Sequence, residues 1–331
     1  MSKIDALTRP FGVKQVRLGF SALLEDFKPE VVHLNNIHTQ LSPIIAEIAH
    51  KRGFKVVWTL HDTKLVCPAY TCQREGKWCD ECFTNKKAVL KHFCLPGNIV
   101  GAFLGWREII KWNKERLQSC TDIFLPPSYF LKNTMIRGGY SSEKLNVLCN
   151  FIDLTKVKGK ESVVKNDYYV FLGRIDGYKG IVTLCEAAIQ MSYILKVIGD
   201  GPLLNYLKST YKNHGNIEFL GQKTWDELCP IVAHAKFMIL PSECSENNPL
   251  TVIESQSLGT PVLGARIGGI PELIDEGVTG MTFESRNVED LKDKIGKMWN
   301  ASWNYEAIAQ QSQERYNAEK YYQEIMKIYQ A

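Results

Sequence analysis

Two carboxylates, Glu246 and Glu254, stand eight positions apart in a stretch whose residue types suit the binding of a polar anion. Between them, Asn248 is a good N-cap residue and Pro249 suits the first helical position, so a helix is predicted to begin there. Backbone amides at a helix N-terminus bind anions, and carboxylates accept hydrogen bonds from hydroxyls. A nucleotide-sugar offers both groups. An ordinary helix with one solvated glutamate is the simpler interpretation of this motif alone.

The rest of the C-terminal half predicts the elements that would position these groups. Strands are predicted over residues 169–173, 194–199, 216–221 and 236–241, with a helix over 180–191. Alternating strands and helices indicate a parallel, doubly wound sheet, and such sheets bind ligands beyond the carboxyl ends of their strands. Arg174 and Lys179 follow the first of these strands and Glu246 follows the last. We therefore expect the three side chains at one edge, although both cations could instead be solvated loop residues.

These motifs resemble those of the retaining GT-B glycosyltransferases of the "glycosyltransferase group 1" family, also called family 4. The resemblance covers about residues 168–284, in order and at family spacing. The matching motifs are Gly173-Arg174 with Lys179-Gly180, Gly199-Asp200-Gly201-Pro202, Phe219-Leu220-Gly221, the Glu246 and Glu254 pair with Gly259-Thr260-Pro261-Val262, Gly268-Gly269-Ile270-Pro271-Glu272, and Gly277-Val278-Thr279-Gly280.

The resemblance implies an α/β protein of the GT-B fold, with two Rossmann-like doubly wound domains facing across a cleft. It implies that Arg174 and Lys179 bind the donor diphosphate, that Glu246 contacts the donor sugar and acts in catalysis, and that Glu254 binds the ribose hydroxyls. Fixed cations and helix amides stabilise the charge that grows on a leaving phosphate, so no metal is expected in the chemistry. The remaining predicted donor-binding residues are Gly199, Gly201, Asn247, Asn248, Pro249 and Leu250.

The N-terminal half predicts a second α/β unit, with strands over residues 29–34, 54–60, 122–126 and 145–148 and a helix over 42–51. Its segments 29–33 and 58–62, Pro127-Ser128 and the junction Asn150–Asp153 also resemble the family. The family analogy places His61 in the cleft near the transferred sugar, as a catalytic residue. The alternative is a strand-end histidine paired with Asp62 at the surface.

The start of the chain departs from the family pattern, which opens with a strand and a glycine-rich loop. Residues 1–28 instead predict a loop and an amphipathic helix. Relative to the family, the chain is expected to be N-terminally truncated. We therefore expect residues 1–28 to be poorly packed, and the chain to bind a nucleoside diphosphate yet transfer poorly. The apolar residues at helical spacing are Val16, Phe20, Leu23, Leu24 and Phe27.

A cysteine-rich insertion over residues 67–94 is a candidate metal site. Its thiols are Cys67, Cys72, Cys79, Cys82 and Cys94. The spacing of Cys79 and Cys82 is typical of a zinc ligand pair, and His92 is a spare nitrogen ligand. A polar insertion without its own core gains most from a metal clip, so a structural zinc ion is predicted. The alternatives are reduced thiols in a loop and adventitious disulfides.

The segment that follows, residues 86–116, is cationic and aromatic. The pattern suits a helix lying on an anionic membrane, but a core helix with a solvated basic face is the preferred interpretation. The apolar residues concerned are Ile99, Phe103, Trp106, Ile110 and Trp112, and the cations are Lys86, Lys87, Lys91, Arg107, Lys111, Lys114 and Arg116.

Composition agrees with a two-domain globular protein. The chain has 331 residues, is 45% hydrophobic and carries a net charge of +4, too small to indicate nucleic-acid binding. No apolar run is long enough to span a membrane and no secretory signal is present, so we expect a cytoplasmic protein, with peripheral contact at the inner face of the membrane as the further possibility. The predicted domains are residues 1–153 on the acceptor side, 154–304 for the nucleotide-sugar, and a helix over 305–331 that packs back on the first domain.

The sequence thus predicts transfer of a sugar from a nucleoside-diphosphate sugar to a hydroxyl acceptor, with retention at the anomeric carbon. The expected acceptor is a glycan or lipid-linked glycan in surface polysaccharide or capsule biosynthesis. Two alternatives from other classes stay open. One is a non-catalytic nucleotide-sugar-binding or scaffold subunit, and the other is a sugar epimerase on the GT-B fold.

Overall fold

The computed structural model describes residues 8–38 and 40–331 and divides the chain into two compact units. Unit 1 comprises Met1–Leu148 and Glu324–Ala331, and unit 2 comprises Cys149–Gln323. The first boundary therefore precedes the predicted junction at Asp153. The predicted loop over residues 1–7 lies outside the described residues.

Unit 2 is built on a six-stranded sheet in which every neighbouring pair of strands is parallel. The strands are β6 (Tyr168–Leu172), β7 (Ile194–Ile198), β8 (Ile217–Gly221), β9 (Met238–Leu240), β10 (Val262–Ala265) and β11 (Gly280–Phe283). Their order is β11-β10-β9-β6-β7-β8, so the direction of winding reverses between β6 and β9. This confirms the predicted parallel sheet. β10 and β11 were not predicted as strands, although each begins at the last residue of a matching motif, Val262 and Gly280 respectively.

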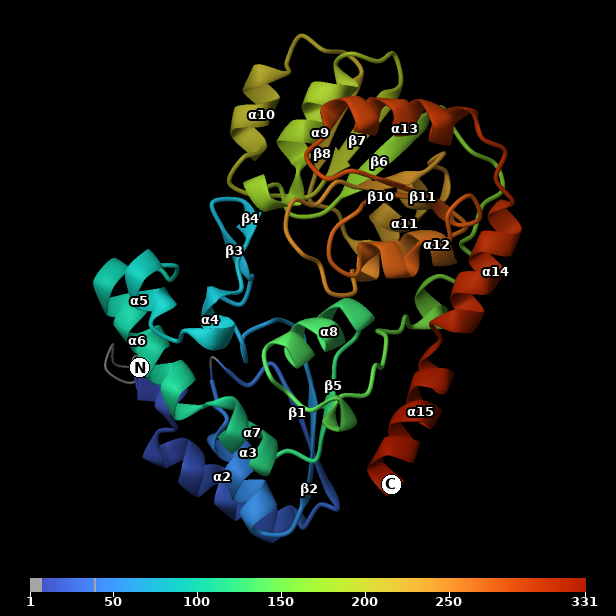
Figure 1. The fold of residues 1–331 in the computed structure, drawn as a ribbon. Coiled ribbons are helices and arrows are strands. Elements are labelled where there is room, and N and C mark those ends of the chain that lie inside the picture. The colour runs from blue at the N-terminus through green and yellow to red at the C-terminus, as the bar shows by residue number, and fades with distance from the viewer. Residues whose placement is uncertain (1–7, 39) are drawn as a thin grey trace. The chain divides into compact units, whose positions relative to one another are not determined.

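Helices cover both faces of this sheet because the central strands are buried on both sides. Figure 1 shows α9 and α13 on one face and α11 and α12 on the other. The helices are α9 (Ile181–Ala188), α10 (Leu204–Thr210), α11 (Trp225–Ala233), α12 (Leu250–Ser257), α13 (Val288–Asn300), α14 (Tyr305–Arg315) and α15 (Ala318–Gln330), with short 3₁₀ turns η3 (Leu154–Lys156), η4 (Gly177–Lys179) and η5 (Ile270–Leu273).

The predicted terminal helix is two helices, and most of it belongs to unit 2. The helical segment breaks between α14 and α15, at Tyr316 and Asn317. α14 packs on α12, where the hydroxyls of Ser257 and Ser312 are 2.9 Å apart. Only Glu324–Ala331 is counted with unit 1. There Tyr329 bonds His33, with its hydroxyl 2.6 Å from the Nδ1 atom.

Unit 1 contains a parallel sheet of β1 (Val31–Asn35), β2 (Lys55–Thr59) and β5 (Ile123–Leu125), in the order β1-β2-β5. The predicted strand over 145–148 is reduced to one bridge between Leu145 and Phe124. A small antiparallel hairpin, β3 (Gln73–Arg74) with β4 (Lys77–Trp78), lies in the cysteine-rich insertion. The helices are α2 (Lys14–Phe27), α3 (Ile44–Lys51), α4 (Glu81–Thr84), α5 (Ala88–His92), α6 (Asn98–Lys111), α7 (Lys114–Ser119) and α8 (Tyr129–Arg137), with η1 (Arg9–Phe11) and η2 (Ser142–Lys144).

α2 confirms the predicted amphipathic helix but corrects the expectation that its apolar face lacks a partner. Leu24 is buried, and Val16 and Phe20 pack against the core of unit 1. This face has a partner because α2 lies against α3. Leu23 and Phe27 are the exposed members of the set.

Candidate functional site

The reversal of strand order in unit 2 brings the predicted donor residues to one edge of the sheet. In a doubly wound sheet, the crevice for a ligand forms beyond the carboxyl ends of the strands where the order reverses. Here those strands are β6 and β9. The loop after β6 carries Arg174 and Lys179, and the loop after β9 carries Glu246.

Lys179 and Glu246 form an ion pair between Nζ and Oε1, and both side chains are largely buried. Ser242 donates its hydroxyl to the same Oε1 atom at 2.9 Å. Burial by itself lowers the pKa of Lys179, but the nearby Glu246 carboxylate outweighs it and the pKa is raised. The ammonium group is therefore held charged, next to a carboxylate that is held in a fixed position.

Arg174 is directed differently. Its guanidinium Nε lies 3.0 Å from the carboxylate of Asp176, and the Arg174 side chain is 70% exposed. The other carboxylate oxygen of Asp176 accepts the backbone amides of Tyr178 and Lys179 at 3.0 and 3.2 Å, and so fixes the turn η4. The two predicted phosphate ligands thus share one loop, but only Lys179 contacts Glu246.

The turn before α12 differs from the prediction in one respect. Pro249 is the N-cap and α12 begins at Leu250, one residue later than expected. Asn248 does not cap the helix because its side-chain oxygen accepts the backbone amide of Asn150 at 3.0 Å. Among the described residues, no side chain accepts the amides of Leu250 and Thr251, so these two remain available to an anion, whereas the Val252 amide donates to the Pro249 carbonyl at 3.2 Å. Asn247 lies in this turn, and Leu250 at the helix start is exposed.

Glu254 lies inside α12, one turn after the N-terminus. Burial raises the pKa of this carboxyl, and Lys156 is the cation that partly offsets the effect. Among the described residues, no donor hydrogen-bonds to its carboxylate. The side chain is half-buried, so this carboxylate is free to accept hydrogen bonds from a ligand.

Gly199 and Gly201 follow β7, and backbone packing requires both to be glycine. Gly199 has a φ of +138°, and a Cβ added there would lie 1.9 Å from the carbonyl oxygen of Gly173. A Cβ on Gly201 would lie 2.3 Å from the carbonyl oxygen of Ile175. The loops after β6 and β7 therefore touch through their backbones, and a donor-binding role for these glycines remains a prediction.

Unit 1 also has polar residues at its strand ends. His61 follows β2, and its Nε2 atom is 3.0 Å from the side-chain oxygen of Asn35 at the end of β1. Burial lowers the pKa of His61, and the charge of Asp62 partly offsets this. Burial raises the pKa of Asp62, whose carboxylate accepts the backbone amide of Lys64 at 2.8 Å. The catalytic role of His61 remains a prediction.

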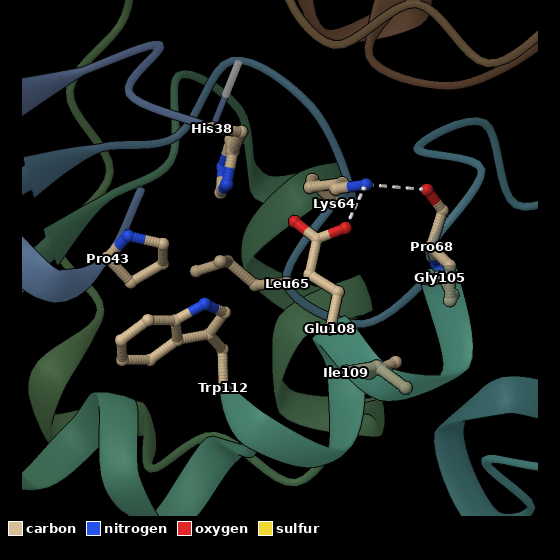
Figure 2. Close-up of a pocket in the computed structure, with 9 residues that line it drawn as sticks. All are labelled: His38, Pro43, Lys64, Leu65, Pro68, Gly105, Glu108, Ile109 and Trp112. Atoms are coloured by element: carbon tan, nitrogen blue, oxygen red, sulfur yellow. Dashed lines mark hydrogen bonds and ion pairs between the residues drawn. The ribbon is translucent and has the colours of Figure 1, made fainter. Parts of the chain in front are cut away.

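Beside these strand ends, unit 1 holds a small cavity that the sequence did not predict. Its volume of about 20 Å³ is enough for one water molecule. Figure 2 shows the Lys64 ammonium between the Glu108 carboxylate and the carbonyl oxygen of Pro68, each 3.0 Å away, with the His38 ring and Trp112 also lining the cavity. Burial, followed by the charge of Lys64, lowers the pKa of His38 to about 4.

The cysteine-rich insertion contains free thiols. The neighbouring Cys72 thiol, with smaller contributions from the backbone amides of Cys72, Ala69 and Thr71, lowers the pKa of Cys67 to about 6 against the effect of burial. His92, the suggested spare ligand, instead contacts Glu81 at 2.9 Å and Arg74 at 2.6 Å. Within residues 8–38 and 40–331, no three His, Cys, Asp or Glu side chains are arranged to hold a metal ion.

α6 exposes part of its apolar surface. Ile99, Phe103 and Ile110 are exposed, whereas Ala102 and Ile109 on the opposite face are buried. Trp112, which was predicted to belong to the same surface, is buried, and its indole donates to the carbonyl of Pro10 at 2.6 Å. In the described part of the chain, no helix is both long and apolar enough to cross a membrane.

Comparison with protein families assigns a domain to each half. Residues 8–156 match the domain described as "Glycosyltransferase Family 4", and residues 155–315 match "Glycosyl transferases group 1". An uncharacterized glycosyltransferase of Methanocaldococcus jannaschii, MJ1178, is 25% identical over 72% of this chain and 73% of its own. The sulfoquinovosyl transferase SQD2 of Arabidopsis thaliana is 36% identical over 70% of this chain, which spans about half of that protein (48%).

Solved structures show the same architecture. Sucrose-phosphate synthase from Thermosynechococcus elongatus superposes with a TM-score of 0.71 at 16% identity, covering 100% of this chain and 79% of that protein. Anabaena Alr3699/HepE in complex with UDP superposes with a TM-score of 0.69 at 14% identity, covering 94% and 81%. At these identities the likeness establishes the fold, which is GT-B.

Proposed function

Because this chain consists of a Glycosyltransferase Family 4 domain followed by a Glycosyl transferases group 1 domain, we propose that it transfers a sugar from a nucleoside-diphosphate sugar to a hydroxyl acceptor with retention. The observation that carries the proposal is the ion pair of Lys179 and Glu246 at the reversal between β6 and β9. It lies in the loops that lead to the uncapped N-terminus of α12. The binding of UDP by the structural neighbour HepE supports a nucleotide ligand.

Each group has a role in the proposed reaction. The bond between the anomeric carbon and the β-phosphate oxygen breaks, and negative charge grows on the leaving diphosphate. Lys179, Arg174 and the first amides of α12 stabilise that charge without reorganising. Glu246 accepts hydroxyls of the donor sugar, and Glu254 accepts those of the ribose. The acceptor oxygen bonds to the anomeric carbon on the face that the diphosphate leaves, and its proton passes to the diphosphate. No metal is required in this scheme.

A donor screen tests the proposal. Melting temperatures with UDP, GDP and ADP identify the base, and the matching sugar nucleotides are then incubated with glycan and lipid-linked acceptors. Release of the nucleoside diphosphate with formation of an α-linked product from an α-linked donor is the expected result. Tight binding without release would favour a non-catalytic subunit, and isomerisation of the sugar would favour an epimerase. Stabilisation by none of the three nucleotides would contradict nucleotide-sugar binding.

We further propose that α6 contacts an anionic membrane that carries a lipid-linked acceptor for surface polysaccharide synthesis. Ile99 and Phe103 are exposed, and Arg107 lies over the Phe103 ring, with its Cζ atom 5.9 Å from the ring centroid. Apolar side chains flanked by cations suit such a surface. Phe103→Glu should reduce sedimentation with vesicles containing anionic lipid, whereas Tyr206→Glu, at an exposed aromatic of unit 2, should not. Equal sedimentation of both variants with the wild type would contradict the proposal.

A structural zinc ion in the cysteine-rich insertion also remains a proposal. The Cys72 thiol, helped by nearby backbone amides, lowers the pKa of Cys67 to about 6 and so favours a thiolate, which is the form that binds zinc. The thiols are not gathered around one point, so zinc would have to draw together ligands from Cys67, Cys72, Cys79, Cys82 and Cys94. Protein purified under reducing conditions should then contain about one zinc ion per chain. Metal-free, fully folded protein would rule the site out.

A further inference from the structure

Asn150 and Asn248 form a closed pair of hydrogen bonds that joins the start of unit 2 to the turn before α12. The backbone amide of Asn150 donates to the side-chain oxygen of Asn248 at 3.0 Å. The side-chain nitrogen of Asn150 donates back to the backbone carbonyl of Asn248 at 2.9 Å. Both residues belong to unit 2, and Asn150 is its second residue.

Asn150 bonds both oxygen atoms of Asn248, the side-chain oxygen and the backbone carbonyl oxygen. Besides the two bonds with Asn150, the side-chain nitrogen of Asn248 contacts the sulfur of Cys149 at 3.8 Å. Asn248 is 6% exposed, so water cannot readily replace a lost partner. Asn248 is thus bonded through its side-chain nitrogen, its side-chain oxygen and its backbone carbonyl oxygen, and has little freedom to move.

The turn that is fixed in this way is the one that must be in place for a donor. Asn248 stands between Glu246, which pairs with Lys179, and Pro249, the N-cap of α12. The Asn248 side chain is used by Asn150, and no side chain in the described part of the chain accepts the amides of Leu250 and Thr251. The same hydrogen bond thus holds the turn and leaves the anion-binding amides open.

We propose that Asn150 is a positioning residue for the donor site, acting through Asn248 on the turn Glu246–Pro249 and on the N-terminus of α12. The proposal rests on the nucleotide-sugar binding proposed above. Asn150 itself need not touch the ligand. A displacement of the turn by a fraction of an ångström weakens contacts made through fixed amides, because such contacts depend on alignment.

The test compares Asn150→Ala with a matched control in the same unit. Asn216 is also half-buried, and its side-chain nitrogen donates to the carbonyls of Ala188 and Met191 at 2.8 and 2.9 Å. Asn216→Ala removes bonds of the same kind away from α12. Titration calorimetry with UDP, GDP and ADP gives the affinity, and thermal unfolding gives the stability of each variant.

We expect Asn150→Ala to raise the Kd of the preferred nucleotide by roughly 3- to 10-fold, the effect of one hydrogen bond. Asn216→Ala should lower the melting temperature about as much as Asn150→Ala does, but it should leave the Kd of the nucleotide within twofold of the wild-type value. Asn150→Asp, which keeps the shape but cannot donate, should weaken binding at least as much as alanine. In an Asn248→Ala background, Asn150→Ala should cost less affinity than in the wild type, because the ring of bonds is already open.

The outcomes separate this inference from the proposed function. If the wild type binds a nucleotide and both Asn150 variants bind it equally well, the positioning role is wrong while the function stands. Equal loss of affinity in Asn150→Ala and Asn216→Ala would also overturn it, since the effect would then follow general stability. If the wild type binds none of the three nucleotides, the proposed function fails and the inference fails with it.

Discussion

The candidate groups of the two units differ in charge. In unit 2, Lys179 has a raised pKa and is paired with Glu246, so the loops at the strand reversal keep their charges. In unit 1, burial lowers the pKa values of His38 and His61, which favours their neutral rings, and it raises the pKa of Asp62. A charged ammonium suits a diphosphate, whereas a neutral imidazole can both donate and accept a hydrogen bond. The two units therefore offer different chemistry to a ligand.

The largest expected effect tests the ion pair of unit 2. Glu246→Ala should reduce transfer by about 10²- to 10³-fold, the typical cost of removing one group that is aimed at the reacting centre. Binding of the nucleoside diphosphate should change much less. Glu243→Gln is the control, because this carboxylate in the same loop faces Thr183 and Arg286 instead. Normal turnover by Glu246→Ala with its acceptor would refute the assigned role.

The next effect separates the two cations. Lys179→Ala and Arg174→Ala each remove a charge-assisted phosphate contact, worth about 1.5–3 kcal/mol of nucleotide affinity. Lys179 should give the larger loss because it is buried beside Glu246, which is then left unpaired, whereas Arg174 is exposed. Calorimetry measures both. Lys196→Ala, at a pair with Glu218 on other strands, should have no effect. Unchanged affinity in both site variants would remove the phosphate assignment.

Acid should destabilise unit 1, because His38 is buried there as a neutral ring. Its pKa is about 4 in the folded state and 6.5 without burial, so the unfolded chain binds more protons between these values. The stability due to the neutral ring is fully present above pH 6.5 and is lost as the pH falls towards 4. Between pH 7.5 and pH 5 the expected loss is about 2 kcal/mol, from about 1.4 kcal/mol per pH unit below 6.5.

Urea unfolding at the two pH values measures this loss. His38→Gln should show a smaller loss than the wild type because it has no ring to protonate. His214→Gln in unit 2 serves as the control and should lose as much stability as the wild type. A His38→Gln profile that parallels the wild type would place the acid sensitivity elsewhere.

The smallest expected effect concerns Glu254. Glu254→Ala removes the proposed acceptor for the ribose hydroxyls, and we expect a loss of about 0.5–1.5 kcal/mol in nucleotide affinity. The side chain is half-buried and has a raised pKa, so its removal should leave the melting temperature unchanged or slightly higher. A nucleotide lacking both ribose hydroxyls should bind the wild type and the variant alike. A uniform loss for both nucleotides would assign Glu254 a purely structural role.

The sequence predicted unit 2 better than unit 1, for a physical reason. In a parallel sheet, consecutive strands and loops fix the site, so Arg174, Lys179 and Glu246 could be placed at one edge from their order alone. The cavity of unit 1 could not be placed in this way. Its lining includes the ion pair of Lys64 and Glu108. Glu108 lies on α6, and the sequence does not specify where this helix packs.

The same limit explains the error at the start of α12. Asparagine is a preferred N-cap residue, so the local sequence predicted that Asn248 would cap α12. In the structure, the side-chain oxygen of Asn248 instead accepts the backbone amide of Asn150, which is distant in the sequence. Local sequence patterns show which hydrogen-bonding groups a residue has, but the tertiary fold determines which partner binds them.

The ion pair of Lys179 and Glu246 means that the lysine already has a counterion within the protein. Inorganic phosphate would have to displace the Glu246 carboxylate from Lys179 while offering few hydroxyls to it in return. A sugar diphosphate brings an anion for the lysine and hydroxyl donors for the glutamate in one molecule. If the proposed function holds, we therefore expect the site to prefer sugar nucleotides over the abundant free inorganic anions of the cell.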